Sequence, residues 1–203
     1  TSATITTNNL NLVGVESGDA VTLTAVANFA DRNVGTGKTV NLLSSTLGGT
    51  HADNYLLSFA GAPTTTANIT AKQLTISNPS LTLSKVYDRT TTAAVTPGTL
   101  SGIESVDDGN VGVTAQANYD NASVGTGKTI TTVYTLTGTA SGNYIKPVNY
   151  VVNNGAITKK TLTISGTFAV SNRVYNGTTS ATITTNNLNL VGVESGDAVT
   201  LTA

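Results

Sequence analysis

The chain of 203 residues contains no cysteine, methionine or tryptophan, and only 10% of its residues are charged. Without cysteine it has no disulfide framework, no thiolate metal site and no cysteine nucleophile, so its stability must come from packing. Binding of nucleic acid or of an anionic membrane needs clustered lysine and arginine, which this composition does not supply. We therefore expect no nucleic-acid partner. No run of eighteen apolar residues occurs, so we expect no membrane insertion.

What is abundant is threonine, about a fifth of the chain, and one long stretch that occurs twice. Residues 1–25 and 179–203 are identical and start 178 residues apart, and a weaker copy lies halfway, at residues 91–115. The basic period is therefore about 89 residues, much longer than the roughly 20 to 45 residues of solenoid repeats. We expect a unit lacking its leading strand at 1–72, a complete unit at 73–160 and the start of a third unit at 161–203.

Alternating apolar and polar residues predict β-strands, and no window has the spacing of an amphipathic helix. Residues 21–29 and 111–119 alternate throughout, and Ile130, Tyr134 and Leu136 share a face of the strand that follows the second VGTGKT. Residues 52–59 and 141–152 also predict strands, the latter with Pro147 at an edge or a bulge.

Residues 80–95 and 167–183 predict a strand, a turn and a second strand, with the turns at Asp88-Arg89 and Asn176-Gly177. The threonine- and isoleucine-rich segments at 68–77 and 156–165 predict short, stiff linkers between units. About seven short strands per unit, with one buried face, predict an all-β chain of tandem immunoglobulin-like β-sandwich repeats.

Five short motifs recur in order: KVYD at 85–88, LSGIESVDD at 100–108, VGTGKT at 124–129, GNY at 142–144 and AITKKTLTI at 156–164. Together they resemble the YDG repeat domain. The resemblance implies mostly-β, glycine-rich modules strung in tandem through very large secreted bacterial proteins, including filamentous-haemagglutinin-like adhesins. It also implies an extracellular, secreted or cell-surface location. Two departures concern turns: Arg89 replaces the name-giving glycine, and Asn176 replaces the aspartate.

GTGKT at 35–39 and 125–129 is similar to the tail of a phosphate-binding loop. The full motif needs a further glycine where this chain has Arg32 and Ala122, and a helix should follow instead of a strand. We therefore predict a structural turn.

Asp107 and Asp108 could contribute oxygen ligands to Ca²⁺, but a polar β-turn is the expectation because the spacing is not that of a calcium loop. His51, the only histidine, predicts a surface loop. We expect no catalytic residues, metal or cofactor.

Three further patterns have alternative interpretations. Lysines at 38, 72, 128 and 160 among many asparagines allow an intramolecular isopeptide bond, for which no buried acid is evident. Asn68, Asn121 and Asn176 match glycosylation acceptors, as chance alone predicts in such a sequence. Tyrosines at 55, 87, 144 and 175 fit either a glycan-stacking set or core-edge aromatics whose hydroxyls reach solvent or backbone, which we favour.

These observations predict a non-catalytic structural segment, a stalk or spacer in a large extracellular bacterial adhesin or surface filament. The alternative is a surface-binding module that recognises polysaccharide, ice or a host surface. The expected partners are neighbouring repeats of the same protein. Because residues 167–203 carry the strand that the unit at 1–72 lacks, we also expect head-to-tail self-association into fibres.

Overall fold

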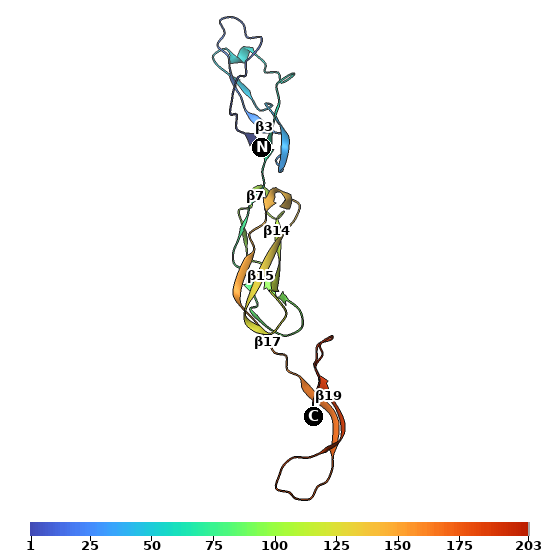
Figure 1. The fold of residues 1–203 in the computed structure, drawn as a ribbon. Helices are drawn as coiled ribbons and strands as arrows, with labels where there is room; N and C mark the ends of the chain where they lie inside the picture. The colour runs from blue at the N-terminus through green and yellow to red at the C-terminus, as the bar shows by residue number, and fades with distance from the viewer. Residues whose placement is uncertain (203) are drawn as a thin grey trace. The chain divides into compact units, whose positions relative to one another are not determined.

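The computed structural model describes residues 1–202, and these are all β, as predicted (Figure 1). The only helical elements in this part of the chain are three single 3₁₀ turns: η1 (Ala52–Asn54), η2 (Ser105–Asp107) and η3 (Ser141–Asn143). Thr, Val, Asn and Gly disfavour helix interiors, which is why the prediction of an all-β chain held.

The chain divides into two compact units. The first comprises Thr1–Thr75, Gly102–Gly112 and Leu136–Lys146; the second comprises Ile76–Ser101, Val113–Thr135 and Pro147–Ala203. Two parts of the expected unit 73–160 therefore cluster with residues 1–75. The compact units therefore do not coincide with the sequence units of about 89 residues. The expected boundaries near Lys72 and Lys160 stay predictions.

The first compact unit contains a four-stranded sheet in the order β1 (Ser2–Ala3), β3 (Ala27–Phe29), β4 (Gly35–Asn41) and β6 (Thr65–Ile69). A separate ladder joins β2 (Thr22–Thr24) to β5 (Thr46–Gly48). Residues 21–29, expected as one strand, therefore change sheets at Val26. There the Ser45 hydroxyl accepts a hydrogen bond from the Val26 N–H at 2.9 Å, so a side chain replaces the ladder partner.

A five-stranded sheet has the order β10 (Ser84–Val86), β17 (Tyr150–Thr158), β15 (Gly125–Thr137), β14 (Gly112–Tyr119) and β11 (Thr92–Ala93). Its last four strands repeat, at sequence-equivalent positions, the order of the four-stranded sheet. β10 is added beside β17 and runs parallel to it. Figure 1 shows β14, β15 and β17 side by side.

The hydrophobic core of this sheet consists of Ala93, Ala117, Tyr119, Ile130 and Ile157. Leu81 and Val95 pack against it from the short ladder of β9 (Ser80–Leu81) with β12 (Val95–Thr96). The alternation predicted for residues 111–119 is confirmed from Val113 onward. Val113 and Ala115 are half-buried and Ala117 and Tyr119 are buried, whereas the residues that alternate with them, Thr114, Gln116 and Asn118, are exposed. Ile130 and Tyr134, predicted on one face, are both fully buried.

One predicted strand is wrong, and another is only partly formed. Residues 52–59 form η1 and then an irregular segment, because the 3₁₀ turn closes with the Tyr55 N–H donating to the Ala52 carbonyl. Residues 141–152 break into η3, β16 (Tyr144–Ile145) and β17, with Pro147 in the connection between the two strands. Since proline has no N–H to donate, it falls where the ladder is interrupted.

The predicted turn at Asp88-Arg89 exists, but the strands beside it do not form a hairpin with each other. β10 and β11 lie at opposite edges of the five-stranded sheet, so the turn connects the two edges. Arg89 has φ +64°, and Gly177, at the equivalent position, has φ +74°. Arg89 therefore keeps the left-handed backbone conformation of the equivalent glycine, although its side chain makes that conformation strained.

Beyond Lys160 the chain forms an antiparallel pair, β18 (Thr163–Val170) with β19 (Ile183–Val191), joined by a long loop that contains Asn176-Gly177. The remaining ladders are short: β7 (Lys72–Gln73) with β16, and β8 (Thr75–Ile76) with β13 (Leu100–Ser101). The expected linker segments are thus hydrogen-bonded strands.

Candidate functional site

Four of the eight ion pairs among residues 1–202 lie where the end of one sequence unit meets residues of the next. The first of these places, which we call the first junction, lies in the first compact unit. β7 runs parallel to β16, and the Leu74 N–H donates to the Ile145 carbonyl at 3.0 Å. Leu74 is only 1% exposed. A leucine in the predicted linker is therefore part of a packed core.

Two ion pairs lie at the first junction. Lys72 Nζ lies 2.5 Å from Glu104 Oε1, and Arg32 Nη2 lies 3.2 Å from Asp107 Oδ1. Asp107 is buried, and its other oxygen accepts a hydrogen bond of 2.8 Å from the Tyr144 hydroxyl. That hydroxyl also accepts the Glu104 N–H at 3.1 Å. Burial raises the pKa of Tyr144, and the Asp107 carboxylate raises it further.

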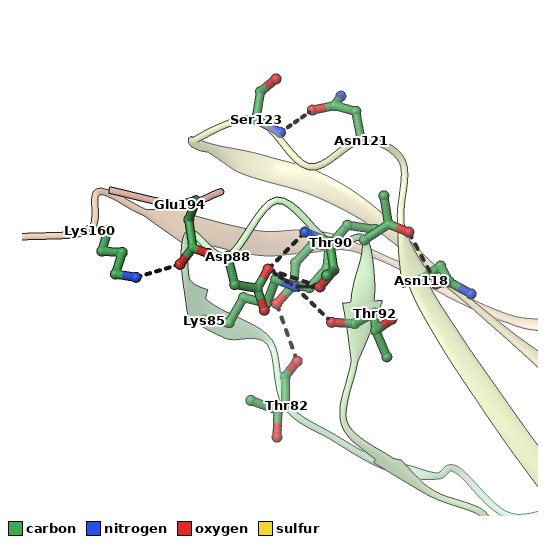
Figure 2. Close-up of polar contacts among 12 residues, drawn as sticks. Thr82, Lys85, Asp88, Thr90, Thr92, Asn118, Asn121, Ser123, Lys160 and Glu194 are labelled. Atoms are coloured by element: carbon green, nitrogen blue, oxygen red, sulfur yellow. Dashed lines mark hydrogen bonds and ion pairs between the residues drawn. The ribbon is translucent and has the colours of Figure 1, made fainter. Parts of the chain in front are cut away.

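The second junction lies in the second compact unit and has the same acidic residues one repeat later. Lys160 pairs with Glu194, as Figure 2 shows. Arg89 Nε lies 3.3 Å from Asp197 Oδ1, and the guanidinium also donates to the Ser195 carbonyl. The Tyr87 hydroxyl donates to Asp197 at 3.2 Å, and this hydrogen bond raises the pKa of Tyr87.

The two junctions use equivalent lysines, equivalent glutamates and equivalent aspartates, but their arginines come from different loops. Arg32 precedes the first VGTGKT, whereas Arg89 stands in the turn after Tyr87. In each case an arginine neutralises the aspartate of the following unit. Arg89 thus gains an ion pair at the position where its backbone is strained.

The same acidic residues occur in the first copy, residues 1–25. The Tyr55 hydroxyl donates to Asp19 at 2.6 Å and accepts the Glu16 N–H at 3.0 Å, as Tyr144 does with its own partners. The hydrogen bond to Asp19 raises the pKa of Tyr55. His51 Nδ1 accepts the Ala20 N–H at 2.8 Å, so this histidine closes the loop as a hydrogen-bond acceptor.

Lys85 is the centre of a polar cluster in the second compact unit, drawn in Figure 2. Its ammonium lies 2.7 Å from Asp88, donates to the Thr90 hydroxyl at 2.7 Å and reaches the Thr92 carbonyl at 3.1 Å. It also lies 5.8 Å from the centre of the Tyr119 ring. The hydrogen bond from Lys85 lowers the pKa of Asp88 to about 2.

The sequence predicts turns ahead of strands for the two GTGKT segments, and this is wrong. The segments form bulges within β4 and β15. The register against the partner strand shifts at each, between Gly35 and Lys38 and between Thr126 and Lys128. The middle glycines, Gly37 and Gly127, have positive φ. A bulge with a left-handed glycine re-aims the next side chain, here the lysine.

The re-aimed lysines contact the preceding loop. Lys38 Nζ lies 2.5 Å from Asp31, and Lys128 Nζ lies 2.6 Å from Asn121, the equivalent residue. All four lysines considered for an isopeptide bond pair with carboxylates, and Lys128, whose carboxylate partner is Asp120 at 3.3 Å, is the one that also contacts an asparagine. Asp31 stands where the second unit has Asn121. The property that these two residues share is that each accepts a hydrogen bond from the lysine.

The glycosylation acceptors and the tyrosines take part in local structure. Asn68 accepts the Gly37 N–H, and Asn176 accepts the Thr178 N–H. Tyr87 packs on the core, and Tyr144 is 8% exposed, as expected of core-edge aromatics. Tyr175 differs: it is 93% exposed, and no sheet covers its loop among the described residues.

The model of the YDG domain matches residues 1–67 and 70–150. The chain belongs to the YDG domain family. No curated protein and no solved structure matches it. Within residues 1–202, this YDG chain has no group of three or more His, Asp or Glu side chains arranged to hold a metal ion. None of the helical turns in the same range is long and apolar enough to cross a membrane.

Sequence reasoning singled out Asp107 and the lysines of this YDG chain but missed their partners Arg32, Glu104 and Glu194. The available signal was the recurrence of Glu16, Glu104 and Glu194 in a chain so poor in charge. Both junctions join segments of the chain. The first combines the buried Leu74, and the second the half-buried Leu162, with charge-assisted hydrogen bonds.

Proposed function

We propose that the chain is a non-catalytic structural segment, a stalk or spacer built from tandem immunoglobulin-like modules in a large extracellular bacterial adhesin or surface filament. The observation that carries the proposal is the repetition of the junction. Lys72 with Glu104 and Lys160 with Glu194 join successive sequence units in the same way, and each junction also has an arginine–aspartate pair.

The distribution of charge supports this role. Exposed ion pairs contribute little each, about 0–1 kcal/mol, but several pairs around a buried leucine resist bending between units. Eight of the 21 charged residues of the chain, 10 basic and 11 acidic, form the four ion pairs of the two junctions. A spacer needs such resistance, because a flexible tether would not hold a distal region at a distance.

Strand switching supports the sandwich part of the proposal. The segment 80–86 pairs first with β12 and then with β17, and the segment 92–96 pairs first with β14 and then with β9. Strands that change partners in this way make the corners between two packed layers.

Pulling on a tandem array by force spectroscopy tests the spacer. We expect unfolding events of equal length, roughly 30 nm each for about 89 residues at about 3.5 Å per residue. Small-angle scattering of the chain and of the variant Lys72→Glu should show a more flexible variant.

Equal flexibility of the two chains, or unfolding in unequal steps, would contradict a stiff modular spacer. Saturable binding of polysaccharide, ice or a host surface by a single unit would instead favour the surface-binding alternative.

A further inference from the structure

The dipeptide Asn-Gly occurs twice in the chain, at 154–155 and at 176–177. In this dipeptide asparagine loses its side-chain ammonia readily, because glycine has no Cβ to hinder attack by its backbone nitrogen on the asparagine carboxamide. Both asparagines are exposed. Their backbones differ, and this difference decides which of the two carboxamides can be attacked.

Asn154 and Gly155 lie within β17, which has β10 on one side and β15 on the other. Gly155 is buried and stands opposite Lys128. A Cβ at Gly155 would lie 2.9 Å from Ile130 Cδ1 and 2.9 Å from the Lys128 carbonyl oxygen, so this backbone is closely packed. Closing a ring between Asn154 and Gly155 would rotate their peptide out of the ladder, and the strand pairing opposes that rotation.

Asn176 and Gly177 lie instead in a turn that folds the asparagine side chain back on its own backbone. The Thr178 N–H donates to Asn176 Oδ1 at 3.2 Å, which is the hydrogen bond of an Asx turn and brings the carboxamide toward the Gly177 nitrogen. Gly177 has φ +74°, close to the +64° of the equivalent Arg89. Since Arg89 fits a whole side chain there, the turn leaves room for ring closure.

Two donors polarise the carboxamide of Asn176. Besides the Thr178 N–H, the Thr178 hydroxyl donates to the same oxygen at 3.0 Å. That hydroxyl accepts a hydrogen bond of 2.8 Å from Arg173 Nη1, and Arg173 Nη2 donates to the Thr178 carbonyl. Attack on the carboxamide places negative charge on its oxygen, and donors aimed at that oxygen stabilise the charge, as in an oxyanion hole.

The equivalent turn in the second unit has the same hydrogen bonds around a carboxylate (Figure 2). The Thr90 N–H and hydroxyl each donate to Asp88 at 2.9 Å, and Lys85 donates to the Thr90 hydroxyl at 2.7 Å. Lys85 also forms an ion pair with Asp88. Asp88 is exposed at the edge of its sheet, so water reaches this position of the repeat.

We propose that Asn176 is a site of spontaneous deamidation, which creates a carboxylate beside Arg173. The Gly177 nitrogen gives its proton to hydroxide and forms a bond to Asn176 Cγ. The Cγ–Nδ2 bond breaks, and the leaving nitrogen takes a proton from water and departs as ammonia. Water then adds to either carbonyl carbon of the five-membered imide and opens it to an aspartate or an isoaspartate.

The product gives this turn the charge of the turn at Asp88. Overall, one asparagine and one water become one carboxylic acid and one ammonia, so the chain becomes one charge more negative. An aspartate fits the turn unchanged, as Asp88 does, and Arg173 pairs with it in the place of Lys85. Because the reaction needs only water, it proceeds in the folded chain without an enzyme.

The test incubates the full chain at mildly alkaline pH and follows both Asn-Gly sites by mass spectrometry of their peptides. We expect Asn176 to react at least about tenfold faster than Asn154, because only the turn allows ring closure. In guanidinium chloride, which removes both the turn and the strand, the two rates should become similar. Asn154 is thus the control within the same chain.

Substitutions of Thr178 test the polarised carboxamide. Thr178→Val removes the hydroxyl and keeps the N–H, and it should slow the reaction at Asn176 about three- to tenfold, less than for an enclosed oxyanion donor because water competes. Thr178→Ser keeps the hydroxyl and should react like the natural chain. Neither change should alter the rate at Asn154.

The ion pair of the product is tested by an NMR titration of the Asn176→Asp variant. The new carboxyl group should have a pKa below the ordinary value of aspartate, and adding Arg173→Gln should return the pKa toward that value. An unshifted pKa would overturn the pairing with Arg173.

Equal rates at the two sites in the folded chain, or a Thr178→Val variant as fast as the natural chain, would overturn the assignment of this turn as the reactive site. The inference does not rest on the spacer proposal, because it concerns the chemistry of one turn and not the stiffness of the junctions.

Discussion

Residues 1–25 and the described part of residues 179–203 have the same sequence but not the same structure. Residues 183–191 form β19 against β18, whereas residues 5–13 belong to no strand. Ser2 and Ala3 pair with β3, whereas the equivalent Ser180 and Ala181 are in the loop before β19. Twenty-four identical residues therefore take two conformations according to what lies beside them.

What the two copies share is local. The Leu10 N–H donates to Asn8 and the Leu188 N–H to Asn186, both at 3.1 Å. The glycines at 14 and 192 have φ +90° and +97°. Contacts over two or three residues are therefore the same in both copies, and contacts between strands differ. The comparison shows that this sequence encodes its turns by itself and its strands only together with a partner.

The largest change in the free energy of unfolding should come from replacing the leucines at the two junctions. Leu74→Ala should destabilise the chain by about 2–4 kcal/mol, because it leaves a cavity in a fully buried site. The matched change Leu162→Ala should cost clearly less, since that residue is half-buried. Urea unfolding of both variants measures the difference; equal costs would mean that the two junctions are packed alike.

Unpairing β19 should make the second copy resemble the first. Gly166 in β18 has φ +102°, and a Cβ there would lie 2.0 Å from the Asn187 carbonyl oxygen. Gly166→Ala should therefore cost at least about 1–2 kcal/mol for the backbone alone and open the β18–β19 pair. Hydrogen exchange should lose protection at Leu188 and Leu190 and keep it at Ile130. Unchanged protection in β19 would contradict the dependence on β18.

Substitutions in the two equivalent turns, at Arg89 and Gly177, should change stability by a smaller amount. Arg89→Gly removes both the strained side chain and the ion pair with Asp197, whereas Arg89→Ala removes only the ion pair. The glycine variant should be more stable than the alanine variant by about 1 kcal/mol. Gly177→Ala serves as the control and should introduce the same strain in thermal melts. A less stable glycine variant would show that the backbone at Arg89 is not strained.

The smallest effect should be the acid response of Asp88. Its pKa is lowered to about 2 by Lys85, below the ordinary value of about 3.9, so the pair stabilises the fold above about pH 4. This contribution is lost as the pH falls through about 2. Asp88→Asn should therefore have a smaller fall in melting temperature between pH 4 and pH 2.

The turn itself should survive this change, because the equivalent Asn176 already accepts the Thr178 N–H and hydroxyl as Asp88 accepts those of Thr90. An identical acid response of the variant and the natural chain would mean that Lys85 and Asp88 do not interact in solution.

The sequence by itself determined that the chain is all β and which faces of β14 and β15 are buried, because a strand with one apolar face shows alternation whatever it packs against. It also determined the left-handed turn at position 89, where even arginine keeps the conformation of the equivalent glycine. These are properties of neighbouring residues.

Only the tertiary structure decided which strands pair and what the charged residues contact. Asp107 is a turn residue in sequence, and it becomes a buried junction residue because Arg32 and Tyr144 reach it from 75 and 37 positions away. Residues 21–29 alternate without interruption, yet Ser45 divides them between two sheets. Pairing across such separations depends on loop closure and on competing partners, and for that reason identical residues form a strand in one copy and none in the other.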